Sequence, residues 1–307
     1  MNFYEIFIEM WTQQFMLRGI IVTGVAAAVC AVLSCWLVLI GWSLLGDALS
    51  HAILPGIVVS YLLGAPFAIG ALVAALLVVG LIGAVRGRGR VKEDTAIGVV
   101  FTTMFASGLV LISLFPSHID LHHILFGDML GITRADMWQV LILSPLALVL
   151  LLYKKRDLVL YAFDKTHAHT IGISTSWLAT LLLVALSLTV VVAMQAVGAI
   201  LIVALVITPG ATARLLTNRF NAMLWIAPLL SVSCVVLGAY ISYWFDTASG
   251  ATVVLLEGVL FLIVWLVDLL RQQRLQRYHG AQTAAPSPDP EPQNRLLLET
   301  TPYGKVR

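Results

Sequence analysis

Residues 20–46 read IIVTGVAAAVCAVLSCWLVLIGWSLLG, a continuous apolar stretch without a charged side chain. About 20 such residues in a helix cross the hydrocarbon core of a bilayer. Five further uncharged runs follow, most of them long enough to span a membrane: 52–85, 95–117, 137–153, 170–213 and 220–245. Because 60% of the residues are hydrophobic and only 11% are charged, a soluble core cannot bury this much apolar surface. The sequence therefore predicts an all-α, polytopic transmembrane helical bundle.

The two longest runs each need an internal break. In the run 52–85, a Gly-Ala-Pro sequence at 64–66 supplies the helix breakers. In the longest run, the polar Gln195 followed by Gly198 marks the expected break. With a final apolar stretch near the C-terminus, we expect eight or nine helices.

Basic residues outside these runs predict the orientation of the chain, because Lys and Arg accumulate in short cytoplasmic loops. With these helix assignments, four basic clusters fall on one side of the membrane: 86–92, 154–165, 214–219 and 271–277. The loops at 116–136 and around Asp246 lie on the other side and carry mainly acidic residues. We expect those loops to face outward.

The two ends of the chain differ in composition from its middle. Residues 1–16 are too mixed for a signal peptide, and we expect an interfacial segment there. Residues 17–270 form the predicted transmembrane domain. Residues 271–307 become polar and Pro-rich, so we expect a disordered cytoplasmic tail. The net charge of +2 gives no indication of a nucleic-acid partner.

Motifs that bind nucleotides or carry out hydrolysis do not occur in the sequence. No G-x-x-x-x-G-K-[ST] is present, so this chain cannot cradle nucleotide phosphates in a P-loop, and ATP-driven transport needs a separate ATP-binding subunit. G-x-S-x-G, H-E-x-x-H and C-x-x-C are absent as well. Cys30, Cys35 and Cys234 lie in apolar runs, where burial as small hydrophobic residues is the favoured role. We expect neither an enzyme nor a covalently bound cofactor.

The clearest candidate site is GDALSHAILPG at 46–56, between two apolar runs. An ionisable side chain near the bilayer centre costs about 3 kcal/mol on insertion scales, so Asp47 and His51 need an explanation. Their spacing of four residues places them on one helix face. A carboxylate oxygen with an imidazole nitrogen suits Mn²⁺, Fe²⁺ or Zn²⁺ better than Mg²⁺ or Ca²⁺. Two ligands hold an ion weakly, whereas a two-fold dimer would supply four. Pro55 is expected to kink the helix beside them.

Structural roles remain open for these and other polar residues. Asp47 and His51 could simply pair with each other or cap a helix. Gln195 and Glu257 either line the transport pathway or form hydrogen bonds between helices. Asp94 has the position of a helix N-cap. The histidines of the outward loop lack the spacing of a closed metal site: His118, His122 and His123.

Five motifs, in this order along the chain, resemble the permeases of the manganese, iron and zinc ATP-binding-cassette importers. They are GDALSHAILPG (46–56), VKEDTAIG (91–98), LFGD (125–128), FDKTHAHTIG (163–172) and TPGATAR (208–214). The resemblance covers residues 15–268 and implies a bundle that works as a dimer, with a second copy of the permease or a paralogue. It also implies two cytoplasmic ATP-binding subunits and an extracytoplasmic metal-binding protein as partners.

Two of these motifs carry functional expectations. The resemblance implies that Asp47 and His51 line the metal pathway. It also implies that residues 163–173 form the coupling helix that docks on the ATP-binding subunit. One departure is the Gly-Trp-Ser sequence at 41–43, where members of the family often carry basic residues. The expected coupling residues are Phe163, Asp164, His167, Ala168 and Gly172.

We therefore expect a permease subunit that imports Mn²⁺ or Fe²⁺, with Zn²⁺ as a further substrate, across the bacterial cytoplasmic membrane by alternating access. A secondary transporter with Asp47, His51 and Glu257 as a proton relay is an alternative, against which the coupling-like segment argues. An ATP-driven importer of a larger metal chelate is another. The sequence does not choose among the three metals, because Asp and His serve all of them.

Overall fold

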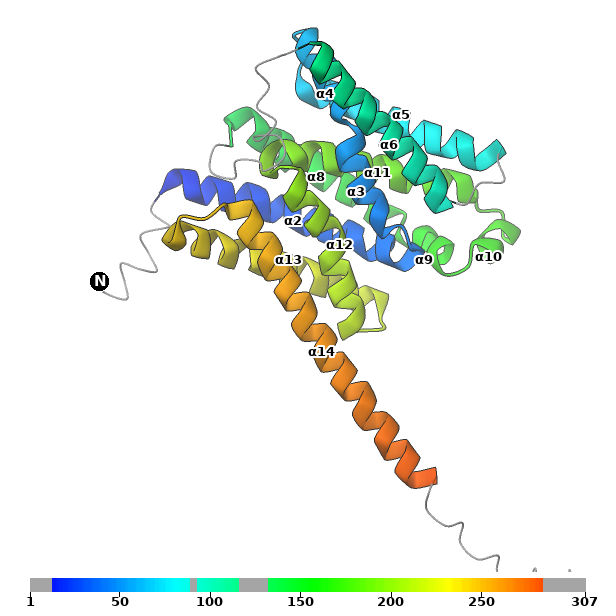
Figure 1. The fold of residues 1–307 in the computed structure, drawn as a ribbon. Coiled ribbons are helices and arrows are strands. Elements are labelled where there is room, and N and C mark those ends of the chain that lie inside the picture. Colours follow the sequence, from blue (N-terminus) through cyan, green and yellow to red (C-terminus); the bar gives the residue numbers. More distant parts are fainter. Residues whose placement is uncertain (1–12, 89–92, 116–131, 284–307) are drawn as a thin grey trace, which may run out of the picture. The chain divides into compact units, whose positions relative to one another are not determined.

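The computed structural model describes residues 13–88, 93–115 and 132–283, and all regular secondary structure in these ranges is α-helical (Figure 1). Contacts divide the chain into two compact units, Met1–Trp265 and Leu266–Arg307. The predicted all-α fold is confirmed. The helices are α2 (Gln14–Ile40), α3 (Ser43–Ala52), α4 (Leu54–Leu62), α5 (Phe67–Arg88), α6 (Glu93–Leu114), α8 (Arg134–Tyr153), α9 (Lys155–Phe163), α10 (Lys165–Thr170), α11 (Thr175–Val197), α12 (Ala199–Leu216), α13 (Phe220–Phe245) and α14 (Ser249–Thr283).

Eight helical segments among the described residues are long and apolar enough to cross a membrane, and α12 contains a shorter apolar stretch. α3 and α4 together make one of the eight segments. The prediction of eight or nine helices is therefore confirmed. The two expected breaks are present as well, because Gly64 lies between α4 and α5 and Gly198 lies between α11 and α12. Both glycines have positive φ values, 65° and 80°, a backbone region that glycine enters without strain.

Helix α2 lies at the centre of the first unit and is mostly buried. The most extensive helix contacts that the structure describes are those of α2 with α12 and with α13 (Figure 1). Where α2 crosses α12, a Cβ added at Gly210 would lie 2.5 Å from the Ser34 hydroxyl oxygen. Such small residues let helices approach closely inside a membrane. The free cysteines are buried, as predicted: Cys30, Cys35 and Cys234.

A second close approach joins α4 to α5. A Cβ added at Gly56 would lie 2.1 Å from the carbonyl oxygen of Gly70, and one added at Gly70 would lie 2.2 Å from the carbonyl oxygen of Gly56. No side chain fits between two backbones at this distance. The crossing therefore fixes α4, and with it the segment that follows the candidate metal ligands.

Both ends of the helical region differ in detail from the sequence prediction. α2 begins at Gln14, inside the segment 1–16 that was expected at the interface. α14 continues to Thr283, so the first part of the predicted tail, 271–307, is helical. This part is rich in Gln and Arg, which favour helix, and the prolines begin only at Pro286. The remaining end segments lie outside the described residues: 1–12 and 284–307.

Candidate functional site

Helix α3 carries both candidate metal ligands and is bounded by a break at each end. Before it, Gly41 takes a left-handed conformation (φ 84°) and donates its N–H to the Leu37 carbonyl at 3.0 Å, which ends α2. After it, the helix breaks at Ile53, and Pro55 lies in the first turn of α4. The kink expected at Pro55 is present, because proline has no N–H to continue the helical ladder. α3 is thus a short helix between two breaks, at Gly41 and at Ile53.

Asp47 and His51 lie on the same face of this helix, as their spacing predicts. The carboxylate Oδ1 is 3.5 Å from the imidazole Nε2, and the side chains are 40% and 28% exposed respectively. This separation is too long for a strong hydrogen bond. Two aromatic rings of α6 lie beside the imidazole, with centroids 6.2 Å (Phe101) and 5.7 Å (Phe105) away. The pair is loosely held and remains accessible to a third partner.

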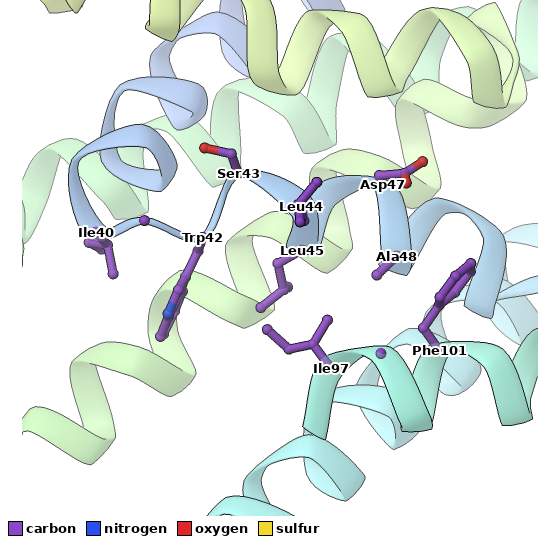
Figure 2. A pocket seen from close by; sticks show the side chains of 11 residues that line it. Ile40, Trp42, Ser43, Leu44, Leu45, Asp47, Ala48, Ile97 and Phe101 are labelled. Atoms are coloured by element: carbon purple, nitrogen blue, oxygen red, sulfur yellow. The ribbon is translucent and has the colours of Figure 1, made fainter. Parts of the chain in front are cut away.

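Asp47 borders two pockets. The first has a volume of about 440 Å³ and lies between the α2–α3 junction and α6. Figure 2 shows its mostly apolar wall, with Ile40 and Trp42 toward one end and Phe101 at the other. The second, of about 350 Å³, is lined by Asp47 and His51 together with residues of α12 and α14: Val203, Ala204, Ile207, Thr208 and Val254. The carboxylate therefore borders both spaces.

The donor set that the described residues provide is incomplete for a transition metal. Among the described residues, no group of three or more His, Cys, Asp or Glu side chains is close enough to hold an ion. Structural metal sites usually have four ligands. Asp47 and His51 are two side chains of suitable type, fewer than such a site needs.

The segment expected to be the coupling helix folds as α10, a short helix with well-defined ends. The Asp164 carboxylate accepts a hydrogen bond from the His167 N–H at 2.8 Å and so caps its N-terminus. At the other end, Gly172 has a φ of 84°, and the Ile173 N–H donates to the Ala168 carbonyl at 3.0 Å. This is a left-handed C-cap, which favours glycine.

The expected coupling residues differ in exposure. Phe163 is 62% exposed, and His167 is exposed as well. Ala168 is fully buried, so it seats α10 on the rest of the protein and cannot contact a partner directly. Asp164 and Gly172 shape the ends of the helix. Of the five, Phe163, Asp164, His167 and Gly172 are exposed, and Ala168 is buried.

Glu257 lies in a sealed environment on α14. Its side chain is buried, with the residue only 3% exposed, and its Oε1 accepts a hydrogen bond from the Ser231 hydroxyl on α13 at 2.8 Å. Its Oε2 is buried and has no hydrogen-bond partner within the part of the chain that the structure describes. A cavity of about 10 Å³ adjoins it, lined in part by Thr208, Thr212 and Cys234. Thr208 also lines the pocket beside Asp47 and His51.

Other residues singled out in the sequence are placed only in part. Gln195 lies in the last turn of α11, before the break at Gly198, and its side chain lies outside the described residues, as does that of Asp94 in the first turn of α6. The outward-loop histidines also lie outside the described ranges: His118, His122 and His123. Sequence reasoning missed Ser231, because an isolated hydroxyl residue in an apolar run gives no local sign of a distant carboxylate. Thr208 begins the TPGATAR motif, but the sequence predicts no contact for it with either pocket.

Comparison with known proteins agrees with this architecture. Residues 12–268 match the model of the ABC 3 transport family. The chain is 44% identical over 264 residues to the manganese transport system membrane protein MntB of Synechocystis sp., covering 86% of each chain. It is 42% identical over 268 residues to the chelated iron transport system membrane protein YfeD of Yersinia pestis, covering 87% of this chain and 90% of the relative.

A solved structure shares both the fold and much of the sequence. A chain of PsaBC from Streptococcus pneumoniae in complex with Fab superposes with a TM-score of 0.77 at 37% identity, covering 86% of this chain and 95% of that chain. The matching family model extends over nearly the whole helical region of the first unit. The chain belongs to the ABC 3 transport family.

Proposed function

We propose that this chain is the membrane-spanning permease subunit of an ATP-driven importer that carries Mn²⁺ or Fe²⁺, and also Zn²⁺, across the bacterial cytoplasmic membrane. The observation that carries the proposal is the pair Asp47 and His51, which share one face of α3 and border two pockets. Relatives that are named for manganese and for chelated iron support the choice of metals. The ion is the transported substrate and is released unchanged.

A second copy of the permease, or a paralogue, completes the ligand set in this proposal. The partial exposure of Asp47 and His51 leaves their face open to such a partner. A two-fold axis beside this face doubles the ligands to two carboxylates and two imidazoles. This mixed oxygen and nitrogen set suits Mn²⁺, Fe²⁺ and Zn²⁺.

In this proposal α10 docks on a cytoplasmic ATP-binding subunit and couples ATP hydrolysis there to the movement of the permease. The exposed side chains of Phe163 and His167 supply the contacts, while Asp164, Ala168 and Gly172 hold the helix in shape. With α10 in the cytoplasm, the C-terminus is cytoplasmic too, and an extracytoplasmic metal-binding protein delivers the ion to the opposite side. The exposed, capped helix is the feature that favours this arrangement over a secondary transporter, which needs no ATPase dock.

Glu257 and Gln195 are candidate pathway residues. Two observations support a route past α12. The Oε2 of Glu257 lacks a hydrogen-bond partner among the described residues, and Thr208 borders both the small cavity and the pocket beside Asp47 and His51. An intramembrane carboxylate is a functional candidate by default, since its burial is costly.

Radioactive metal uptake tests the proposal in cells that carry Asp47→Ala or His51→Ala. Both variants should lose Mn²⁺ and Fe²⁺ uptake at an unchanged level of permease in the membrane. Asp157→Asn is the matched control, because this carboxylate on α9 pairs with Lys154, the residue before the helix, at 3.1 Å, outside the apolar spans. Wild-type uptake by both site variants would contradict the assignment.

Import of a larger metal chelate is the competing function, and competition separates the two. Free Mn²⁺ should compete with labelled free Fe²⁺ for uptake, because both bind the same small ligand set. Competition by an iron chelate but not by free Mn²⁺ would favour the chelate importer.

A further inference from the structure

Lys165, the first residue of α10, lies over two aromatic rings that come from different parts of the chain. Its Nζ is 5.3 Å from the ring centroid of Tyr161 on α9 and 5.8 Å from that of Trp42 at the start of α3. The two rings meet edge to face, with centroids 6.4 Å apart and an interplanar angle of 67°. Cations within about 6 Å of an aromatic centroid are attracted by the ring quadrupole. We call these three residues the Trp42 clamp.

The members of the clamp differ in burial. Trp42 and Tyr161 are buried, at 4% and 3% exposed, so their rings are fixed by the surrounding side chains. Lys165 is exposed and stands on a six-residue helix at the surface. Lys165 thus belongs to α10, the helix that a second subunit can displace. The two rings belong to α9 and to the start of α3, which such a displacement would reach.

The backbone of Trp42 is tied to both neighbouring helices. Its N–H donates to the Leu37 carbonyl at the end of α2, at 2.8 Å, and its carbonyl accepts from the Leu45 N–H in the first turn of α3, at 3.0 Å. Gly41, with its left-handed backbone, precedes it and caps the C-terminus of α2. A displacement of the indole therefore turns α3 as a unit about this junction.

The same helix ends at the break before Pro55, so its turning is not transmitted rigidly into α4. Between the two breaks lie Asp47 and His51. Trp42 and Asp47 also line one pocket, at different points of its wall (Figure 2). The position of the carboxylate relative to α6 then depends on where Trp42 is held.

We propose that the Trp42 clamp transmits the displacement of α10 to the metal-binding helix α3, an inference that rests on the proposed function. Lys165 is a positioning residue in this scheme, because it acts through Trp42 and does not touch the ion. Neither α10 nor α3 needs to unfold for the signal to pass.

Thiol labelling of Ser43→Cys tests the transmission without using metal transport. Ser43 lines the pocket beside Trp42, and the native cysteines at Cys30, Cys35 and Cys234 are buried, so background labelling is low. In membranes that contain the permease with its ATP-binding subunit, the maleimide labelling rate is compared without nucleotide and with vanadate-trapped nucleotide. The rate should change several-fold in the protein with native Lys165.

Substitutions at Lys165 then decide the outcome. Lys165→Gln should reduce the nucleotide-dependent change in the labelling rate of Ser43→Cys roughly two- to five-fold, as expected for the loss of an exposed cation–π contact. Lys165→Arg should restore it, because a guanidinium also stacks on aromatic faces. Arg156→Gln removes a charge from the preceding helix and should leave the change intact.

Two results would overturn the proposal: a nucleotide-dependent change in labelling rate that is as large in Lys165→Gln as with native Lys165, or no such change with native Lys165. Metal uptake is measured in parallel on the same membranes. Absence of uptake with an intact labelling change would count against the proposed function and leave the clamp standing.

Discussion

Two carboxylates, Asp47 and Glu257, interrupt the apolar helices of this protein in opposite environments. The side chain of Asp47 is 40% exposed, stands 3.5 Å from an imidazole and borders pockets of about 440 and 350 Å³. Glu257 is only 3% exposed, is hydrogen-bonded to Ser231 at 2.8 Å and adjoins a cavity of about 10 Å³. The first carboxylate is open and loosely partnered, whereas the second is closed in.

The difference between Asp47 and Glu257 indicates which of the two carboxylates an ion can reach. A cation needs space to enter and ligands that are free to turn toward it, and Asp47 has both. A cavity of about 10 Å³ holds at most about one water-sized particle, so Glu257 can receive an ion only when α12, α13 and α14 move apart. Asp47 is therefore the primary binding residue in the proposed mechanism, and Glu257 acts later or only through its charge.

Neutralising the open carboxylate should have the largest effect. Asp47→Asn keeps the shape of the side chain but removes its charge, and we expect metal uptake to fall at least about ten-fold, since loss of even an outer-shell partner costs roughly 10- to 100-fold in metal affinity. Initial uptake rates at a matched level of membrane protein measure this loss. Equal metal uptake by Asp47→Asn and by the control Asp157→Asn would contradict the assignment of Asp47 as the ion-binding carboxylate.

Neutralising the sealed carboxylate should have a smaller effect. Glu257→Gln can keep the hydrogen bond with Ser231, so folding should be preserved, while uptake falls several-fold because the negative charge near the pathway is lost. Ser231→Ala is the matched variant, since it removes the hydrogen bond and keeps the charge. Unchanged uptake in Glu257→Gln together with reduced membrane protein in Ser231→Ala would assign Glu257 a structural role.

Glycine substitutions compare the packing of the two regions. A Cβ at Gly238, beside the Glu257 region, would meet the Cγ2 of Val253 at 2.5 Å and its backbone at 3.0 Å, whereas one at Gly46, next to Asp47, would meet only side-chain atoms of Val206. Gly238→Ala should therefore lower the stability by about 1–3 kcal/mol, as overpacking typically does, and Gly46→Ala by less. Thermal unfolding in detergent measures the difference.

Gly24→Ala is the control for this series, because nothing lies within 4 Å of an added Cβ there. Alanine is also the better helix former by roughly 0.5–1 kcal/mol, so this variant should be at least as stable as the parent. Equal destabilisation by Gly46→Ala and Gly238→Ala would show that the open region is packed as rigidly as the sealed one.

Local features of the fold could be predicted from the sequence, and distant contacts could not. The uncharged runs predict the helices, and Gly64 and Gly198 mark the breaks between them. The spacing of Asp47 and His51 predicts that they share one helix face. Each of these features depends on neighbouring residues alone. The pairing of Ser231 with Glu257 and the approach of Lys165 to Trp42 depend on how separate helices pack. α14 extends to Thr283, beyond the predicted end of the transmembrane domain at residue 270, because Gln and Arg favour helix there and the first proline comes only at Pro286.

The central claim is that Asp47 and His51 bind the transported ion, and pulsed electron paramagnetic resonance of Mn²⁺ bound to the purified permease tests it most directly. Coupling of the manganese electron spin to an imidazole nitrogen reports a histidine ligand. We predict this coupling in the native protein and in Glu257→Gln, and its loss in His51→Gln. Nitrogen coupling that persists in His51→Gln, or that is missing from the native protein, would contradict the account.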